Sequence, residues 1–263
     1  MIHFVKYHGT GNDFILIDGR DIELPTLDVA LLCHRRFGIG ADGLMIIQNR
    51  AGYDFEMVYY NSDGETSSMC GNGGRCIAHW AWTLGIVGNR KELNFWAPDG
   101  EHVAYINEDR SVRLGMRDVE HYDELNETDA TLDTGSPHYV RQVHQLPKNF
   151  IDQARSIRNQ KEYISEGINV NMYEVCSNFQ LKSRTFERGV EDETWSCGTG
   201  ATAVALHFAL QHTSQEAPVV IQTLGGNLKV YFERSTNGFK NVFLEGPATF
   251  VYSGHLQLKK GIR

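Results

Sequence analysis

Two cysteines stand in matching surroundings. In MCGNGGRC (69–76) and SCGTGATA (196–203), a cysteine directly precedes a glycine-rich turn that opens an apolar, helix-like stretch. A cysteine just ahead of a helix lies where unpaired backbone N–H groups and the helix dipole favour negative charge, so its thiolate is stabilised. We therefore predict that Cys70 and Cys197 are reactive. The remaining cysteines lack this context and are interpreted as ordinary buried thiols: Cys33, Cys76 and Cys176.

The glycines beside each sulfur leave room for a carboxylate to approach the backbone. Its oxygens would meet the N–H groups of four residues: Gly71, Asn72, Gly198 and Thr199. When an amino acid loses its α-proton, charge flows into the α-carboxylate, and two helix N-termini would stabilise that charge. Inversion also needs a base on one face and an acid on the other, which two thiols supply. The pattern predicts an amino-acid racemase or epimerase.

Other thiol chemistry remains open as an alternative. Cys70, Cys76 and His79 could hold zinc, but the Cys-x5-Cys spacing is not a usual finger pattern and no second cysteine pair follows. A redox module with a Cys70–Cys197 disulfide is the other alternative, and metal analysis with thiol titration would decide. The sequence contains no pyridoxal-phosphate lysine motif, P-loop or G-x-G-x-x-G after a strand, so we expect neither cofactor nor metal.

The elements that must position the thiols repeat along the chain. The cysteines are 197 − 70 = 127 residues apart, and two glycines that each precede a probable strand, Gly11 and Gly135, are 135 − 11 = 124 residues apart. Alternating patterns at 53–59, 103–105, 112–116 and 228–232 predict half-buried strands, most of them antiparallel. The helices after the two cysteines are apolar nearly all round and must be enclosed.

These patterns predict an α+β fold of two pseudo-symmetric lobes, each a curved, mostly antiparallel sheet around a central helix. The first lobe is expected to span residues 1–117 and to be completed by a C-terminal strand at 248–263; the second spans 118–247. We expect the two helix N-termini to face a shared cleft.

Composition limits the partners. The 263-residue chain has a formal net charge of −8 and no dense Lys/Arg run, which argues against nucleic acid or an anionic membrane surface and favours a small polar substrate. The first residues do not resemble a signal peptide, and no segment approaches the 18 apolar residues of a membrane helix. We therefore expect a cytoplasmic protein.

Eight motifs stand in a characteristic order: GTGNDF (9–14), FGIGADGL (37–44), NSDG (61–64), MCGNGGRC (69–76), GINVN (167–171), ERG (187–189), SCGTGATA (196–203) and GPATFVYSG (246–254). Over nearly the whole chain they resemble the diaminopimelate epimerase family. Proline racemases share that fold and thiol pair, but their first motif resembles Cys-Gly-His-Gly, whereas Asn72 stands here.

The resemblance implies epimerisation of LL-diaminopimelate to the meso form without a cofactor, for lysine and peptidoglycan precursors. It makes Cys70 the proton donor and Cys197 the acceptor in that direction. It also implies five side chains that bind the substrate: Asn12, Asn61, Asn169, Glu187 and Arg188. The four backbone N–H groups named above would hold the reacting α-carboxylate.

Other physical roles compete with some of these assignments. Arg188 can fork onto the distal carboxylate, but it could instead form a surface ion pair. Each asparagine could merely serve a turn or cap. His138 and Glu187 match family positions that tune the thiol pKa values, although His138 could be an ordinary hydrogen-bonded histidine.

Two departures from the family pattern affect ligand contacts. Many members carry Asn where Ser136 stands, and some carry Gln where Gly43 stands. The shorter serine predicts a water-mediated contact. The resemblance also implies a homodimer with Tyr252 at the contact, or else Tyr252 is an ordinary strand aromatic. The main rival function is a racemase or epimerase of the same fold that acts on another amino acid, such as histidine, which substrate profiling would distinguish.

Overall fold

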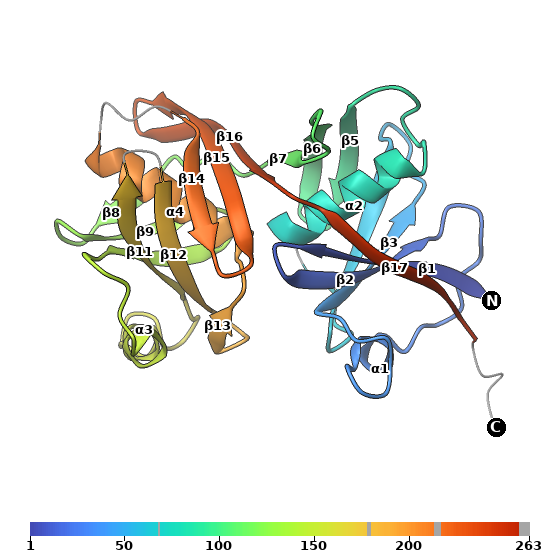
Figure 1. The fold of residues 1–263 in the computed structure, drawn as a ribbon, viewed down its shortest axis with the longest axis horizontal. Coiled ribbons are helices and arrows are strands. Elements are labelled where there is room, and N and C mark those ends of the chain that lie inside the picture. The colour runs from blue at the N-terminus through green and yellow to red at the C-terminus, as the bar shows by residue number, and fades with distance from the viewer. Residues whose placement is uncertain (68, 178–179, 213–216, 258–263) are drawn as a thin grey trace. The chain divides into compact units, whose positions relative to one another are not determined.

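The computed structural model describes residues 1–67, 69–177, 180–212 and 217–257 (Figure 1). It divides into two compact units. The N-terminal unit comprises Met1–Val112 and the chain from Pro247 onward, and the C-terminal unit comprises Arg113–Gly246. These bounds lie a few residues from the lobe boundaries expected at 117/118 and 247/248. The end of the expected last strand, 258–263, lies outside the described residues.

The N-terminal unit holds two helices, α1 and α2, among its described residues. Its elements are β1 (Ile2–Gly9), β2 (Asn12–Asp18), α1 (Val29–Cys33), β3 (Gly43–Gln48), β4 (Phe55–Asn61), α2 (Gly71–Thr83), β5 (Glu92–Ala97), β6 (Gly100–Ile106) and β17 (Thr249–Leu256).

The C-terminal unit has a similar make-up, with its first strand beginning at the unit boundary. Its elements are β7 (Val112–Gly115), β8 (Tyr122–Glu124), β9 (Asp129–Asp133), β10 (Pro137–Gln142), α3 (Phe150–Arg158), β11 (Asn169–Ser177), β12 (Gln180–Glu187), β13 (Asp192–Thr194), α4 (Gly198–Gln211), β14 (Val219–Thr223), β15 (Gly226–Ser235) and β16 (Gly238–Gly246).

The two units repeat one order of strand pairing. In the N-terminal unit, β1 and β2 are antiparallel, β2 and β3 parallel, β3 and β4 antiparallel, β4 and β5 parallel, and β5 and β6 antiparallel. The series β9, β10, β11, β12, β14 and β15 alternates in the same way. Each parallel pair is joined by a crossover that carries a helix, because only a crossover returns the chain to the same end of the sheet. The predicted mostly antiparallel α+β fold is confirmed, with these parallel pairs added.

Each unit encloses one of the apolar helices. In α2, residues 71–78 are all buried, and in α4, residues 200–209 are all buried, as the absence of a polar face predicts. Close packing depends on a glycine three residues after each cysteine. A Cβ at Gly73 would lie 2.0 Å from Met45 Cε, and one at Gly200 would lie 2.4 Å from Asn171 Oδ1. Both helices therefore lie directly against the third residue of the neighbouring strand, β3 or β11.

The register identifies equivalent residues in the two units. Phe14 pairs with Gly43 between β2 and β3, and His138 pairs with Asn169 between β10 and β11. The offset 138 − 14 = 124 equals that between the two turn glycines. The same offset relates Asn12 to Ser136. Residues named as site candidates thus occupy repeated positions of one scaffold.

Candidate active site

Both predicted thiols are N-cap residues. Cys70 precedes α2 with φ −106° and ψ 128°, and Cys197 precedes α4 with φ −120° and ψ 118°. In each case the backbone turns from an extended to a helical conformation directly after the cysteine. The free N–H groups of the first helical turn and the positive end of the helix dipole therefore lie beside each sulfur. Each helix N-terminus by itself would therefore stabilise an anion bound beside its cysteine.

The two sulfurs differ in their hydrogen bonds. Cys197 Sγ accepts from the Gly200 N–H at 3.4 Å and lies 3.3 Å from Thr199 Oγ1. Cys70 makes no side-chain cap bond, and its Sγ instead donates to Asn12 Oδ1 at 3.6 Å. An N–H group stabilises a thiolate, whereas a carbonyl oxygen stabilises a thiol. The contact of Cys197 with an N–H is thus one that a thiolate can accept, and the contact of Cys70 with an amide oxygen is one that only a thiol can make.

Three of the predicted residues of the N-terminal unit lie together. Asn72 is 1% exposed in the first turn of α2, and its Nδ2 donates to Asn12 Oδ1 at 3.3 Å, next to Cys70. Asn61 is the last residue of β4, opposite Gly43. Within the described residues, no hydrogen bond links the Asn61 side chain to the other three. The sequence alone could not show that Asn12 and Asn72 lie beside Cys70 while Asn61 makes no hydrogen bond to them within the described residues.

Gly43 is required by packing. A Cβ at this position would lie 2.6 Å from Tyr59 Cε2 and 2.8 Å from the carbonyl oxygen of Tyr60. A side chain there would need these neighbours on β4 to move.

In the C-terminal unit, Asn169 joins Ser136 to Arg188. Asn169 Nδ2 donates to Ser136 Oγ at 2.9 Å and to the carbonyl oxygen of Pro137 at 3.0 Å, while its Oδ1 accepts from the Arg188 N–H at 2.9 Å. Arg188 Nη2 lies 3.5 Å from Ser136 Oγ. Asn169 is almost fully buried and therefore fixes the base of the Arg188 side chain.

The Arg188 guanidinium is exposed. It donates to the carbonyl oxygen of Glu166 at 3.3 Å, but no carboxylate of the described residues forms an ion pair with it. The alternative of a surface ion pair is therefore not what this structure contains. An exposed guanidinium without a carboxylate partner is suited to bind a carboxylate of a ligand.

His138 is fully buried on β10 and is held by a residue that the sequence analysis missed. Asn171 Nδ2 lies 2.9 Å from His138 Nδ1, so this nitrogen accepts and the proton resides on Nε2, which has no partner among the described residues. Burial, with the charge of Arg188 as a smaller cause, lowers the pKa of His138 to about 3. The imidazole is thus neutral near pH 7.

Asn171 connects this histidine to the thiol helix. Its Oδ1 accepts from Thr185 Oγ1 at 2.8 Å and occupies the space beside Gly200. Strand alternation could have identified it, because Asn171 lies two residues after Asn169 and shares its face of the strand. Glu187 ends β12 and is partly exposed. Its role in tuning the thiols stays a prediction.

Arg75 is a second residue that the sequence analysis missed. It is 0% exposed in α2, and its guanidinium donates to the carbonyl oxygen of Gly71 at 3.0 Å, Asn72 Oδ1 at 3.0 Å and Thr10 Oγ1 at 3.3 Å. No carboxylate forms an ion pair with it within the described part of the chain. Burial lowers the pKa of Arg75. An arginine inside an otherwise apolar helix was the available signal.

The remaining cysteines differ in burial and in pKa. All five cysteines are free. Burial raises the pKa of Cys76 to about 12 and that of Cys33 to about 11. Among the described residues, no three His, Cys, Asp or Glu side chains are grouped as metal ligands. The expectation that Cys176 is buried was wrong: it is exposed, because the end of β11 runs beyond the core.

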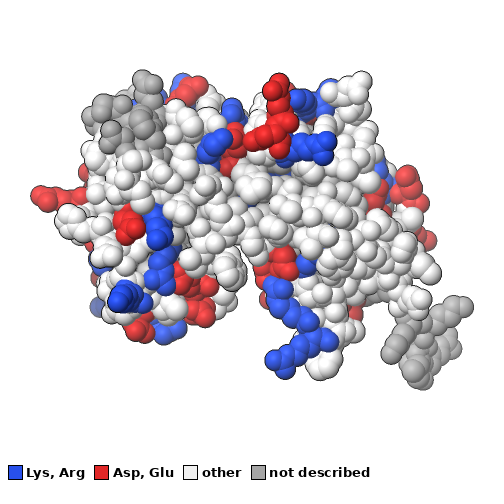
Figure 2. Space-filling view, in the orientation of Figure 1, with Lys and Arg blue, Asp and Glu red and all other residues white. Residues whose placement is uncertain are grey.

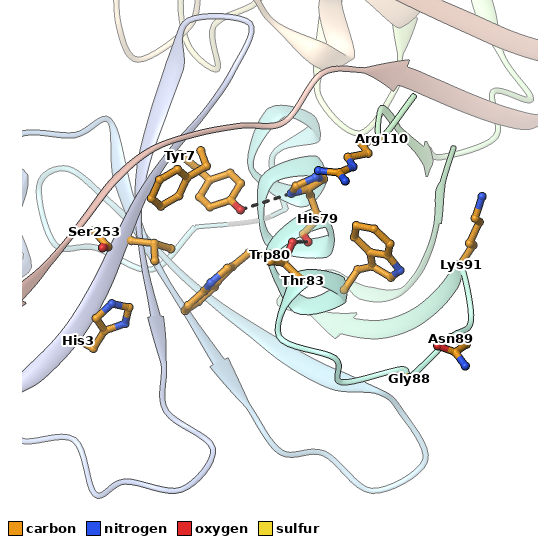
Figure 3. A pocket seen from close by; sticks show the side chains of 13 residues that line it. His3, Tyr7, His79, Trp80, Thr83, Gly88, Asn89, Lys91, Arg110 and Ser253 are labelled. Atoms are coloured by element: carbon orange, nitrogen blue, oxygen red, sulfur yellow. Dashed lines mark hydrogen bonds between the residues drawn. The ribbon is translucent and has the colours of Figure 1, made fainter. Parts of the chain in front are cut away.

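A separate cavity of about 810 Å³ lies along the second half of α2 (Figure 3). Its lining includes Tyr7, His79, Trp82, Arg110 and Phe250, and the Tyr7 hydroxyl points toward His79 Nδ1 at 3.4 Å. None of the predicted site residues lines it. The cavity is thus distinct from the surroundings of Cys70.

The surface and the helices add two observations. On the face seen in Figure 2, basic and acidic side chains are interspersed rather than gathered into one field. Such a pattern gives this face no continuous basic track of the kind that binds phosphate backbones.

Throughout the described ranges, each helix is too short or too polar to cross a membrane.

Comparison with known proteins extends these observations. The family model described as diaminopimelate epimerase matches residues 4–121 and 130–251. A diaminopimelate epimerase of Flavobacterium psychrophilum is 45% identical over 251 residues, which are 94% of this chain and 97% of that protein. One of Chlorobaculum tepidum is 39% identical over 258 residues, which are 95% and 99% of the two chains.

Two solved structures share the fold at low sequence identity. A phenazine biosynthesis protein of the PhzF family from Bacillus anthracis has a TM-score of 0.75 and 14% identity, with 98% of this chain and 99% of that chain covered. A probable proline racemase from Agrobacterium radiobacter has a TM-score of 0.69 and 15% identity, with 98% and 94% covered. At this identity the likeness concerns the fold alone.

Proposed function

The chain belongs to the diaminopimelate epimerase family, and we propose that it interconverts LL- and meso-diaminopimelate with Cys70 and Cys197 as its two acid/base groups. The enzyme is an isomerase, and its reaction serves lysine biosynthesis. The observation that carries the residue assignment is the matched pair of N-cap cysteines with opposite hydrogen-bond roles. Such a pair provides one base and one acid before any substrate arrives.

In the direction from LL to meso, the Cys197 thiolate removes the α-proton, and the electrons of the C–H bond pass into the α-carboxylate as an enediolate. Backbone N–H groups at the two helix N-termini stabilise this charge: those of Gly71, Asn72, Gly198 and Thr199. The Cys70 thiol then donates its proton to the opposite face of the α-carbon. This leaves a thiolate at Cys70 and a thiol at Cys197, so the reverse reaction exchanges their roles.

Recognition of the distal end of the substrate is proposed for the C-terminal unit. Arg188 would bind the distal carboxylate, supported by its exposed guanidinium and its lack of a carboxylate partner among the described residues. Asn169 accepts a hydrogen bond from the backbone N–H of Arg188, and Ser136 lies beside the guanidinium. A site that leaves such polar groups unpaired discriminates against amino acids with one functional end, which argues against histidine as substrate.

The other predicted residues complete this proposal. Asn12 and Asn61 would bind the substrate from the N-terminal unit. His138 presents a neutral Nε2–H that has no partner in the described part of the chain, and we propose that it tunes Cys197 together with Glu187. A neutral donor stabilises a thiolate without forming a fixed ion pair with it, so the thiol can still regain its proton.

We further propose a homodimer that forms through β17. Three consecutive apolar side chains on this strand are about half exposed: Phe250 51%, Val251 50% and Tyr252 42%. Such a patch favours association with another surface. Sedimentation of wild type and Tyr252→Asp should show a dimer and a monomer, respectively, and a wild-type monomer would refute the dimer. A cytoplasmic location is proposed because both thiols must stay reduced.

The test is proton NMR of LL-diaminopimelate in D2O with reduced, metal-free protein. Wild type should form the meso isomer with deuterium at the inverted carbon. Cys70→Ala and Cys197→Ala should each lower epimerisation by about 10³-fold or more, because each removes one of the two obligatory proton carriers. Cys176→Ala is the matched control and should keep full activity, since Cys176 is exposed and has no part in the site.

Each result distinguishes between functions. Inversion of LL-diaminopimelate but not of L-histidine would support the assigned substrate, whereas wild-type silence with diaminopimelate would exclude it. Wild-type inversion that survives in either alanine variant would exclude the two-thiol assignment. Activity that depends on added metal or on a disulfide would favour the zinc or redox alternative.

A further inference from the structure

Two asparagine side chains of the N-terminal unit stand between two charged groups. At one end, Asn12 Nδ2 donates to Asp42 Oδ2 at 2.7 Å. At the other end, Arg75 Nη2 donates to Asn72 Oδ1 at 3.0 Å. The amides meet in the middle, where Asn72 Nδ2 donates to Asn12 Oδ1 at 3.3 Å. The result is one continuous chain of hydrogen bonds from a guanidinium to a carboxylate.

The charged ends fix the direction of this chain. A carboxylate can only accept and a guanidinium can only donate, so neither amide can flip without placing two donors or two acceptors face to face. Asn12 must therefore present Oδ1, not Nδ2, to Cys70 Sγ at 3.6 Å. An amide oxygen cannot donate, so this contact exists only when Cys70 carries its proton.

Asp42 is itself held in place from several sides. Arg35 Nη2 donates to Asp42 Oδ1 at 2.6 Å, and the Asp13 N–H donates to Asp42 Oδ2 at 3.1 Å. Arg35 also forms an ion pair with Asp13 at 2.8 Å, and Lys6 forms another at 2.7 Å. This cluster lowers the pKa of Asp13 to about 2, chiefly through Arg35 and Lys6 against the effect of burial. Donors from Asn12, Arg35 and the Asp13 backbone thus hold the Asp42 carboxylate as an acceptor.

We propose that Asp42 is a positioning residue of the epimerase: by fixing Asn12, it keeps Cys70 in the protonated form that donates to the substrate. The proposal rests on the proposed function, in which Cys70 is the acid from LL to meso. The C-terminal unit lacks this device, since Ser136 takes the place of Asn12 and is engaged by Asn169.

Other charged groups also surround Cys70. Arg75 and Cys76 on α2 interact with it electrostatically, and the Asp99 carboxylate accepts from the N–H of the adjacent Met69 at 3.4 Å. Of these groups, only Arg75 bears on the direction of the Asn12 amide, through Asn72 at the other end of the chain of hydrogen bonds. A substitution at Asp42 leaves all of them in place, so its effect can be assigned to Asn12 and to the lost charge.

The test is the pH dependence of Cys70 alkylation by iodoacetamide in a Cys197→Ala background, followed by mass spectrometry of the Cys70 peptide. Asp42→Asn should lower the midpoint of this profile by about one pH unit, a roughly tenfold gain in thiolate below the midpoint. The amide that replaces the carboxylate can donate as well as accept. The Asp42 end of the chain then no longer requires a donor from Asn12, so an orientation in which its Nδ2 faces the sulfur and stabilises the thiolate becomes accessible, with loss of the bond from Asn72.

Arg35→Gln is the matched control because it removes a charge beside Asp42 but keeps the bond from Asp42 to Asn12. Under the proposal, its midpoint stays within about 0.3 pH units of the parent. A shift in Arg35→Gln that mirrors that of Asp42→Asn would mean that charge alone acts, and the positioning role would be wrong. An unchanged midpoint in folded Asp42→Asn, judged by circular dichroism, would also overturn it.

A second variant covers the case in which Asp42→Asn does not fold. Asn12→Ser removes the acceptor from Cys70 Sγ, since the serine hydroxyl is too short to reach it, and should also lower the midpoint. No change in this variant counts against the proposal. The assay contains no diaminopimelate, so a negative result here leaves wild-type epimerisation, and with it the proposed function, to be decided separately by NMR.

Discussion

The two units share a backbone plan but support their thiols differently. Beneath α4 lie His138 and Asn171, while the equivalent positions beneath α2 hold Phe14 and Met45. The polar network of the N-terminal unit lies instead on the other side of its cysteine, where Asn12 is located. The repeated scaffold thus supplies two N-cap thiols, and in the proposed mechanism the side chains packed around them distinguish acid from base.

A second equivalent pair shows how the helices differ internally. Arg75 and Thr202 each lie five residues after their cysteine (75 − 70 = 5 and 202 − 197 = 5). Each donates to the carbonyl oxygen of the first helical residue, Gly71 or Gly198, at 3.0 Å. Only Arg75 brings a charge. The helix that follows Cys70 therefore carries a buried charge at this position, whereas the equivalent position after Cys197 is neutral.

The largest difference in stability is expected between substitutions of Arg75 and of Thr202. Arg75→Met should lower the free energy of unfolding by about 4 kcal/mol, because it removes the buried hydrogen bonds of the guanidinium to the Gly71 carbonyl oxygen, Asn72 Oδ1 and Thr10 Oγ1. Thr202→Val removes one neutral hydrogen bond and should cost about 1 kcal/mol. Urea unfolding at pH 7 measures both. Equal losses would show that the charged network contributes no more than the hydroxyl.

Gly73 and Gly200 each lie three residues after a cysteine, and alanine substitutions there should lower the free energy of unfolding by unequal amounts. Gly200→Ala places its Cβ against Asn171 Oδ1, which is held by hydrogen bonds to Thr185 and His138, and should cost about 3 kcal/mol. Gly73→Ala meets the flexible end of Met45, which can move aside, and should cost about 1 kcal/mol. The same unfolding assay compares them. A larger loss for Gly73→Ala would contradict the rigidity assigned to Asn171.

The buried histidine should make stability depend on pH through the C-terminal unit. Unfolded His138 binds a proton near pH 6.5, whereas in the folded protein its pKa is lowered to about 3 by burial. Above pH 6.5, His138 is neutral in both states and costs no stability. As the pH falls from 6.5 toward 3, the unfolded state gains a proton that the folded state does not, and the free energy of unfolding decreases. Between pH 7 and 5, wild type should lose about 2 kcal/mol more than His138→Gln.

Urea titrations at both pH values test this difference, and the exposed His255→Gln serves as control, with a loss that matches that of wild type. Parallel losses in wild type and His138→Gln would mean that His138 is protonated in the folded protein. The comparison between a neutral and a charged half-site would then fail.

Features that depend on neighbouring residues could be predicted from the sequence. The N-cap position of Cys70 and Cys197 follows from the glycines and apolar residues beside them, and the enclosure of α2 and α4 follows from helices without a polar face. The repeat offset located the equivalent turns. Local spacing determines these features directly, so one sequence was enough.

Features that depend on contacts between distant segments could not be predicted from the sequence. Asp42 reaches Asn12 across 30 residues, and Asn171 reaches His138 across 33. Which side chains meet depends on strand register, and the parallel pairs that set it require crossovers not visible in local patterns. The exposure of Cys176 was missed for the same reason, because alternation does not show where a strand leaves the core.

The smallest effect is expected at Ser136, the counterpart of Asn12. Ser136→Ala removes the acceptor of Asn169 Nδ2 and the contact with Arg188 Nη2, both within the C-terminal unit. Because Arg188 would still be held by its backbone N–H, only its guanidinium loses support, at about 1 kcal/mol. The KM for LL-diaminopimelate should rise about fivefold while kcat changes little, since under the proposed function this group binds the distal carboxylate and does not contact the reacting carbon.

Steady-state kinetics with Ser111→Ala, a substitution in the turn before β7, provides the control. A fall in kcat without a change in KM would place Ser136 at the reacting carbon, as its equivalence to Asn12 alone would suggest. The kinetic split therefore decides whether the repeated position kept its role in both units. A rise in KM alone would mean that the two units share the backbone of this turn but use its side chain differently, with Asn12 beside the thiol and Ser136 beside Arg188.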